Sequence, residues 1–66
     1  MKVYKKIKLV GISDKSVEDA INNAIAKAAE TLRGLSWFEV KEVRGSVENG
    51  KVKEFQVVLE VAFEVE

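Results

Sequence analysis

The side chains that could carry chemistry in this 66-residue chain are few, because it contains neither histidine nor cysteine. Histidine is the commonest general base and metal ligand, and cysteine would be needed for a thiol nucleophile, a zinc thiolate site or a disulfide. Carboxylates, lysines and Tyr4 remain, but their spacing forms no catalytic arrangement and no glycine-rich phosphate loop is present. We therefore predict a binding protein that is not an enzyme and has no metal centre.

Trp37, the only tryptophan, is the strongest candidate for a binding residue. It lies in a segment that is typical of a β-strand, where alternate side chains point to opposite faces of a sheet. If Phe38 and Val40 point into the core, Trp37 and Glu39 point away from it. A large apolar side chain left in water forfeits about 1.5–3 kcal/mol of burial. We therefore expect a second subunit or a flat ligand to cover the indole.

The elements before Trp37 are predicted to be a strand and a helix. Apolar residues alternate with lysines from Val3 to Leu9, and Lys5 interrupts the inward row, which indicates a strand that is at an edge or ends in a solvated margin. Ser16 and Asp19 resemble a capping box at the start of a helix, and Gly34 is expected as the residue that follows its end. Apolar residues three and four apart mark the helix face that packs on the sheet: Val17, Ala20, Ile21, Ala24, Ile25, Ala28, Ala29 and Leu32.

The elements that position Trp37 are two strands joined by a hairpin. The first strand covers about 37–47, and its alternation slips after Val40, which predicts a bulge near Glu42. Asn49-Gly50 predicts a type I′ turn. In the last strand one face carries Phe55, Val57, Leu59, Val61, Phe63 and Val65. Gln56 lies on the other face, together with Trp37. The predicted fold is α+β: a single β-α-β-β domain over residues 1–66, with a three-stranded antiparallel sheet wrapped around one helix.

The composition limits the partners. Eleven basic residues balance eleven acidic ones, which argues against nucleic acid and membrane surfaces as partners. No apolar run approaches the roughly 20 residues of a membrane span, and no signal peptide is recognisable, so a cytoplasmic protein is expected. A chain this short buries only about 60% of its unfolded surface, and without disulfides or metal, oligomerisation is the expected source of added stability.

The order of these signals resembles the dodecin family of small flavin-binding proteins. The resemblance rests on Val3-Tyr4-Lys5, Leu9-Val10-Gly11, Ser16-Val17-Glu18-Asp19-Ala20-Ile21, Thr31-Leu32-Arg33, Trp37-Phe38-Glu39-Val40, Arg44-Gly45 and Phe55-Gln56-Val57. It implies a hollow homododecamer that stores and sequesters flavin non-covalently, in stacked pairs whose excited state is quenched. Trp37 is implied to stack on the flavin, Gln56 to pair with its pyrimidine-like ring, and Arg44 to lie near its tail. FMN is the first choice of flavin, with FAD or riboflavin as alternatives.

An alternative interpretation is a structural oligomeric shell that binds another ligand, with Trp37 as an interface anchor. Some bacterial members of the family resemble coenzyme A binders, and Lys5, Lys27 and Arg33 could serve that role. Glu64 stands where many members carry a basic residue and would repel a phosphate. A divalent cation is the other alternative, held by carboxylates that line channels of the shell: Glu39, Glu60 and Glu64.

Overall fold

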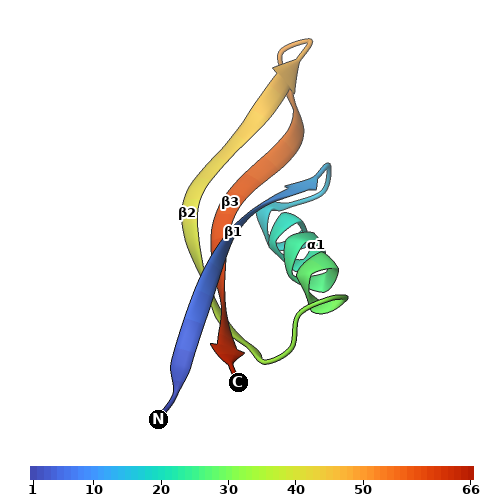
Figure 1. Ribbon diagram of the computed structural model, residues 1–66. Helices are drawn as coiled ribbons and strands as arrows, with labels where there is room; N and C mark the ends of the chain where they lie inside the picture. Colours follow the sequence, from blue (N-terminus) through green and yellow to red (C-terminus); the bar gives the residue numbers. More distant parts are fainter.

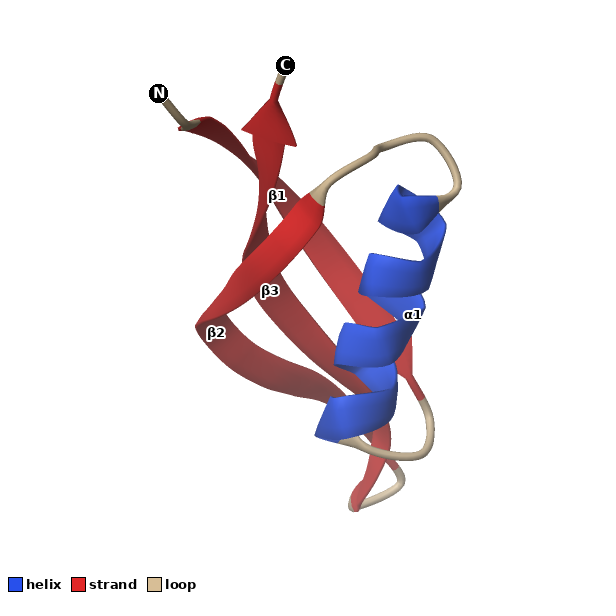
Figure 2. Cartoon of the chain, turned by 90° about the horizontal axis from the view of Figure 1, so that it is seen from below, coloured by secondary structure: helices blue, strands red, loops and turns tan.

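In the computed structural model, which describes residues 1–66, the chain folds as β1 (Val3–Ser13), α1 (Val17–Ala29), β2 (Leu35–Glu48) and β3 (Lys51–Val65). The strands form one antiparallel sheet in the order β1-β3-β2. The helix lies against one face of this curved sheet, and both termini lie at the same end of the molecule (Figures 1 and 2). The predicted β-α-β-β fold is confirmed, as is the edge position of β1.

The core lies between α1 and the central strand β3. Val57, Leu59 and Val61 of β3 are the largest fully buried side chains, and they pack with Ala20 and Ala24 of the helix. Alanines at the contact let the helix approach the sheet closely. The closest approach is at Gly11 in β1, where an added Cβ would overlap the carbonyl oxygen of Ala20. Gly11 is therefore required for the helix to dock at this distance.

The end of the helix differs from the prediction. The helix ends at Ala29 with Glu30 as its C-cap, so Leu32 lies outside it and Gly34 is not the residue that follows the cap. The helical spacing of apolar residues misplaced the end of the helix because Leu32, although it lies in the loop, is still half-buried. Gly34 has a different function: it adopts φ +74°, and its carbonyl accepts a hydrogen bond from the Glu64 N–H at 3.1 Å. This bond ties the loop to β3.

The predicted irregularities of the hairpin are confirmed. Val40 pairs with Leu59 and Glu42 pairs with Val58, so Lys41 is the extra residue of a bulge. The bulge brings Val43 to the helix side of the sheet. At the tip of the hairpin, Asn49 and Gly50 have φ values of 55° and 74°, as a type I′ turn requires. The tip extends well beyond the end of the helix (Figure 1).

The helix packs mainly on β1 and β3, and apart from Leu35, which packs against the core, it leaves the helix side of β2 uncovered. Phe38 and Val40 do lie on that side, opposite Val61 and Leu59, but they remain 45% and 42% exposed. These two side chains therefore point to the core side of the sheet but are not buried in the core of the single chain, because one helix is too narrow to cover three strands. The uncovered apolar margin of the hairpin comprises Phe38, Val40, Val43, Val47 and Val52.

Candidate functional site

All three predicted site residues lie on the face of the sheet opposite α1, which we call the outer face. Residues that pair across neighbouring strands share a face of the sheet. Trp37 pairs with Ala62, and Arg44 pairs with Gln56. Ala62 and Gln56 are on the same side of β3, because they are an even number of positions apart. The predicted placement of Trp37 and Gln56 on one outward face therefore agrees with the observed register.

The indole of Trp37 is hydrogen-bonded at one edge, and much of its surface is exposed to solvent. The side chain is 44% exposed. Its Nε1–H donates a hydrogen bond to Glu39 Oε2 at 3.0 Å, and the Tyr4 ring of β1 contacts it with ring centroids 4.9 Å apart and planes tilted by 54°. The hydrogen bond satisfies the only polar atom of the indole. What remains exposed is an apolar aromatic surface suited to stacking.

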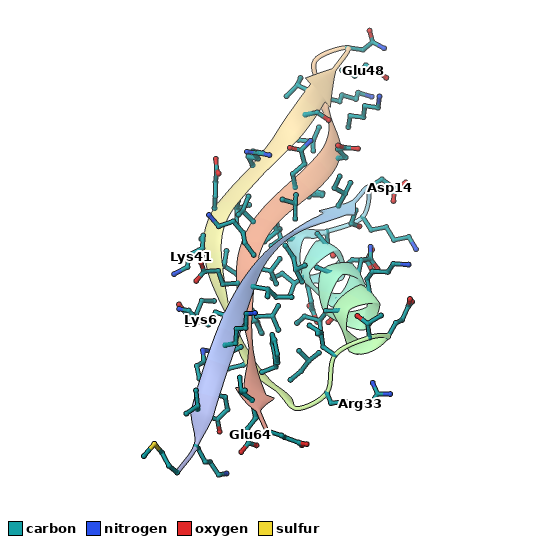
Figure 3. All side chains as sticks on the ribbon, in the orientation of Figure 1. Lys6, Asp14, Arg33, Lys41, Glu48 and Glu64 are labelled. Carbon is teal, nitrogen blue, oxygen red and sulfur yellow. The ribbon has the colours of Figure 1, made fainter.

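A cluster of four charged side chains lies beside Trp37 on the outer face, and we call it the charge cluster. It consists of Lys6, Glu39, Lys41 and Glu60, one or two from each strand. Lys6 Nζ lies 3.1 Å from Glu39 and 3.2 Å from Glu60, and Lys41 Nζ lies 3.0 Å from Glu39. Lys6 and Lys41 project from the side of the sheet away from the helix (Figure 3). Each carboxylate therefore has a lysine counter-ion.

Gln56 is held by two charged neighbours. Arg44 Nε donates to Gln56 Oε1 at 2.8 Å, and Gln56 Nε2 donates to Glu54 Oε2 at 2.8 Å. These two bonds fix which way the amide points. One amide N–H and one lone pair of the amide oxygen remain for a ligand. Two of the predicted site residues, Arg44 and Gln56, are therefore in direct contact. Arg44 Nη1 also lies 3.5 Å from Glu42 Oε1.

Trp37 is far from the Arg44–Gln56 pair within one chain. Trp37 lies opposite Ala62, six positions along β3 from Gln56. At about 3.3 Å per residue, the two levels of the sheet are roughly 20 Å apart. A single flavin ring system does not span that length. The structure thus brings Arg44 and Gln56 together and separates both from Trp37.

Only some of the side chains proposed as alternatives for binding coenzyme A or a cation lie close together. Lys5, Arg33 and Glu64 line one shallow pocket beside the end of β3, whereas Lys27 pairs with Glu30 at 3.4 Å and is not part of it. Arg33 and Glu64 lie at the lower end of the molecule in Figure 3. Glu64 lies four positions along β3 from Glu60, which pairs with Glu39, so it is roughly 13 Å from that level of the sheet. No group of three or more acidic side chains that could hold a metal ion is present.

Comparison with known proteins decides the family. A family model described as Dodecin matches residues 3–66. The chain belongs to the dodecin family. A curated dodecin from Thermus thermophilus is 58% identical over 65 residues, which cover 98% of this chain and 94% of that protein. The resemblance found in the sequence is therefore confirmed over nearly the whole length of this dodecin-family chain.

Solved dodecin structures have the same fold. The dodecin of Streptomyces coelicolor superposes with a TM-score of 0.95 at 43% identity, covering 98% of this chain and 93% of that one. The calcium dodecin of Mycobacterium tuberculosis superposes with a TM-score of 0.83 at 31% identity, covering 97% and 91%. That protein is described as a calcium-chelating antigen with a novel calcium-binding site. In the present chain, no helix has the length and apolarity needed to cross a membrane.

Three contacts of the candidate site were not predicted from the sequence. Glu39 and Glu54 each lie two positions from a predicted site residue, so strand alternation alone places them on the same face and could have indicated both contacts. Tyr4 is different. It reaches Trp37 from β1, at the opposite edge of the sheet, and no local pattern reports the pairing of strands so far apart in the sequence.

The charge cluster predicts an unusual titration of Glu39. The indole N–H of Trp37, followed by Lys41 and Lys6, lowers the pKa of Glu39 from 4.5 to about 2. Lys6 also lowers the pKa of Glu60. Because folding lowers the pKa of Glu39, its stabilising contribution is complete above about pH 4.5 and is lost as the pH falls through about 2. Carbon NMR of the Glu39 carboxyl group should show a midpoint near pH 2, and a midpoint near 4.5 would contradict the observed contacts.

Proposed function

We propose that this protein binds flavin non-covalently and stores and sequesters it in a hollow homododecamer. The observation that carries the proposal is the half-exposed indole of Trp37 on the outer face of a chain that belongs to the dodecin family. Tryptophan is highly buried on average, and burial of a large apolar side chain contributes about 1.5–3 kcal/mol, so covering the exposed part of this indole is favourable. The outer face offers surfaces for binding and no arrangement for a reaction.

The chemistry of the available groups fits a flavin. A flavin supplies a flat aromatic ring system with neighbouring carbonyl and N–H groups. Trp37 offers an aromatic plate, and offset stacking adds about 0.5–1.5 kcal/mol beyond burial. Gln56 retains one donor and one acceptor after its bonds to Arg44 and Glu54, which is the pair of groups that an adjacent carbonyl and N–H require. The guanidinium of Arg44, which lies beside them, would favour an anionic tail such as that of FMN.

The proposal requires more than one subunit. Trp37 and Gln56 are roughly 20 Å apart along β3, so a flavin that contacts both must receive Trp37 from one chain and Gln56 from another. Pairing of two Trp37 side chains about a two-fold axis would enclose two stacked flavins. The uncovered apolar margin of the hairpin supports assembly independently, since contiguous exposed apolar surface is typical of subunit interfaces.

The absorption spectrum of the freshly purified protein tests the function. We expect a yellow protein with visible flavin absorption, and we expect added FMN to lose its fluorescence when it binds, because stacking against an indole quenches the excited ring. Sedimentation should show a dodecamer of 7.4 kDa chains. A colourless protein that leaves FMN fluorescence unchanged would contradict the proposal. Parallel titrations with FAD and riboflavin identify the preferred flavin.

A second candidate function is cation binding by the same shell. It is supported by the calcium-chelating description of the Mycobacterium tuberculosis relative, which is 31% identical. In this candidate, Trp37 is an interface anchor and flavin titration shows nothing. The lysine counter-ions of Glu39 and Glu60 disfavour it, because a cation would have to displace them. Calorimetric titration with Ca²⁺ separates the two candidates.

A further inference from the structure

The Glu39 carboxylate contacts Trp37 and two lysines of the charge cluster. Its Oε2 accepts the indole N–H at 3.0 Å, while Lys41 Nζ lies 3.0 Å from its Oε1 and Lys6 Nζ lies 3.2 and 3.1 Å from its two oxygens. Lys6 belongs to β1 and Lys41 to the bulge of β2. The carboxylate is therefore anchored from two strands, although its side chain is 37% exposed. Charge-assisted bonds of this kind are stronger than neutral ones.

An indole on a strand surface needs such an anchor to keep one orientation. Side-chain torsions of an exposed tryptophan can adopt several staggered positions, and binding must select one of them. The indole has a single polar atom, so one hydrogen bond at that atom fixes which edge of the ring turns toward the sheet. Tyr4 contacts the ring from the β1 side. Together these contacts define which ring surface is presented to a ligand.

We propose that Glu39 is a positioning residue for Trp37: its lysine-anchored carboxylate holds the indole in the binding orientation before a flavin arrives. This inference rests on the proposed function, and it assigns Glu39 a role that acts through Trp37 without contact to the flavin. Pre-organisation of this kind increases affinity because less side-chain freedom is lost on binding.

Glu60 provides a matched control within the same charge cluster. Its carboxylate lies 3.2 Å from Lys6 and 3.6 Å from Lys41, yet it makes no hydrogen bond to the indole. Removing Glu60 therefore disturbs the same lysines and changes the net charge equally. Only the loss of Glu39 also frees the indole N–H. A difference between the two variants reports on the hydrogen bond itself.

The experiment compares Glu39→Ala, Glu39→Gln and Glu60→Ala, first without flavin. Because the chain has one tryptophan, its near-ultraviolet circular dichroism and fluorescence anisotropy report on Trp37 alone in the tryptophan region. We expect Glu39→Ala to lose the ordered indole signal, Glu60→Ala to keep it, and Glu39→Gln to recover part of it, since an amide oxygen still accepts the N–H. Sedimentation confirms that each variant is assembled.

The same variants are then titrated with FMN. We expect Glu39→Ala to weaken binding roughly 3- to 10-fold, as expected for one side chain that must be ordered on binding, and Glu60→Ala to change it less than twofold. The inference is overturned if Glu39→Ala keeps the indole signal and FMN affinity of the parent. It is also overturned if Glu60→Ala loses as much indole signal and affinity as Glu39→Ala does. If the parent protein fails to bind FMN, the proposed function fails, while the flavin-free spectra still decide whether Glu39 orients Trp37.

Discussion

Replacing Trp37 with alanine is expected to weaken FMN binding by roughly 30- to 1,000-fold and to abolish quenching of its fluorescence. Burial of a large apolar side chain and offset stacking together contribute about 2–4 kcal/mol to the complex, which corresponds to that range of affinity. The single-chain structure leaves the indole 44% exposed, so a ligand has surface to cover. Fluorescence titration of the assembled variant with FMN measures the effect.

Phe38→Ala is the matched control for this prediction. Phe38 is the adjacent aromatic residue with nearly the same exposure, 45%, but it lies on the opposite face of β2. Its loss should weaken assembly more than it changes the affinity of the remaining assembled protein for FMN. If Trp37→Ala binds FMN as tightly as the parent, the stacking role is wrong. If Trp37→Ala dissociates the assembly and the parent shows no flavin binding, Trp37 is an interface anchor.

Gly11→Ala is expected to destabilise the protein by about 3 kcal/mol or more. The added methyl group would overlap the backbone carbonyl group of Ala20 and would lie 3.1 Å from the Cβ of Ala24. Overpacking commonly costs 1–3 kcal/mol, and here the obstructing atom is backbone that no side-chain rotation can move. The helix must then shift away from β1. Thermal unfolding at a fixed protein concentration should show a Tm at least 10 °C lower, at about 4–8 °C per kcal/mol for a domain of this size.

Gly50→Ala separates steric overlap from the general cost of replacing a glycine. Gly50 lies at the tip of the hairpin, where an added Cβ meets nothing within 4 Å, although its φ of +74° disfavours alanine. We expect a cost of about 1 kcal/mol there. Equal loss of stability in the two variants would show that close packing of β1 on the helix is not what Gly11 provides.

The sequence by itself determined most of the fold and the face on which the candidate site lies. Alternation of period two placed Trp37 and Gln56 on the outer face, and the break in that alternation predicted a bulge near Glu42, where the structure has Lys41 as the extra residue. The Asn49-Gly50 pair determined the hairpin turn. These features depend on residues that are near one another in the chain, so they can be predicted from the sequence before the fold is known.

Only the tertiary structure decided how those local features combine. It placed β3 in the centre, ended the helix at Ala29, and left Phe38 and Val40 outside the core because the helix covers only two of three strands. It also bonded Arg44 to Gln56 and set both roughly 20 Å from Trp37. Such distances depend on which residues of neighbouring strands lie opposite each other, and the bulges in β2 shift that register. A pattern of period two specifies the face of a strand but not the register between strands.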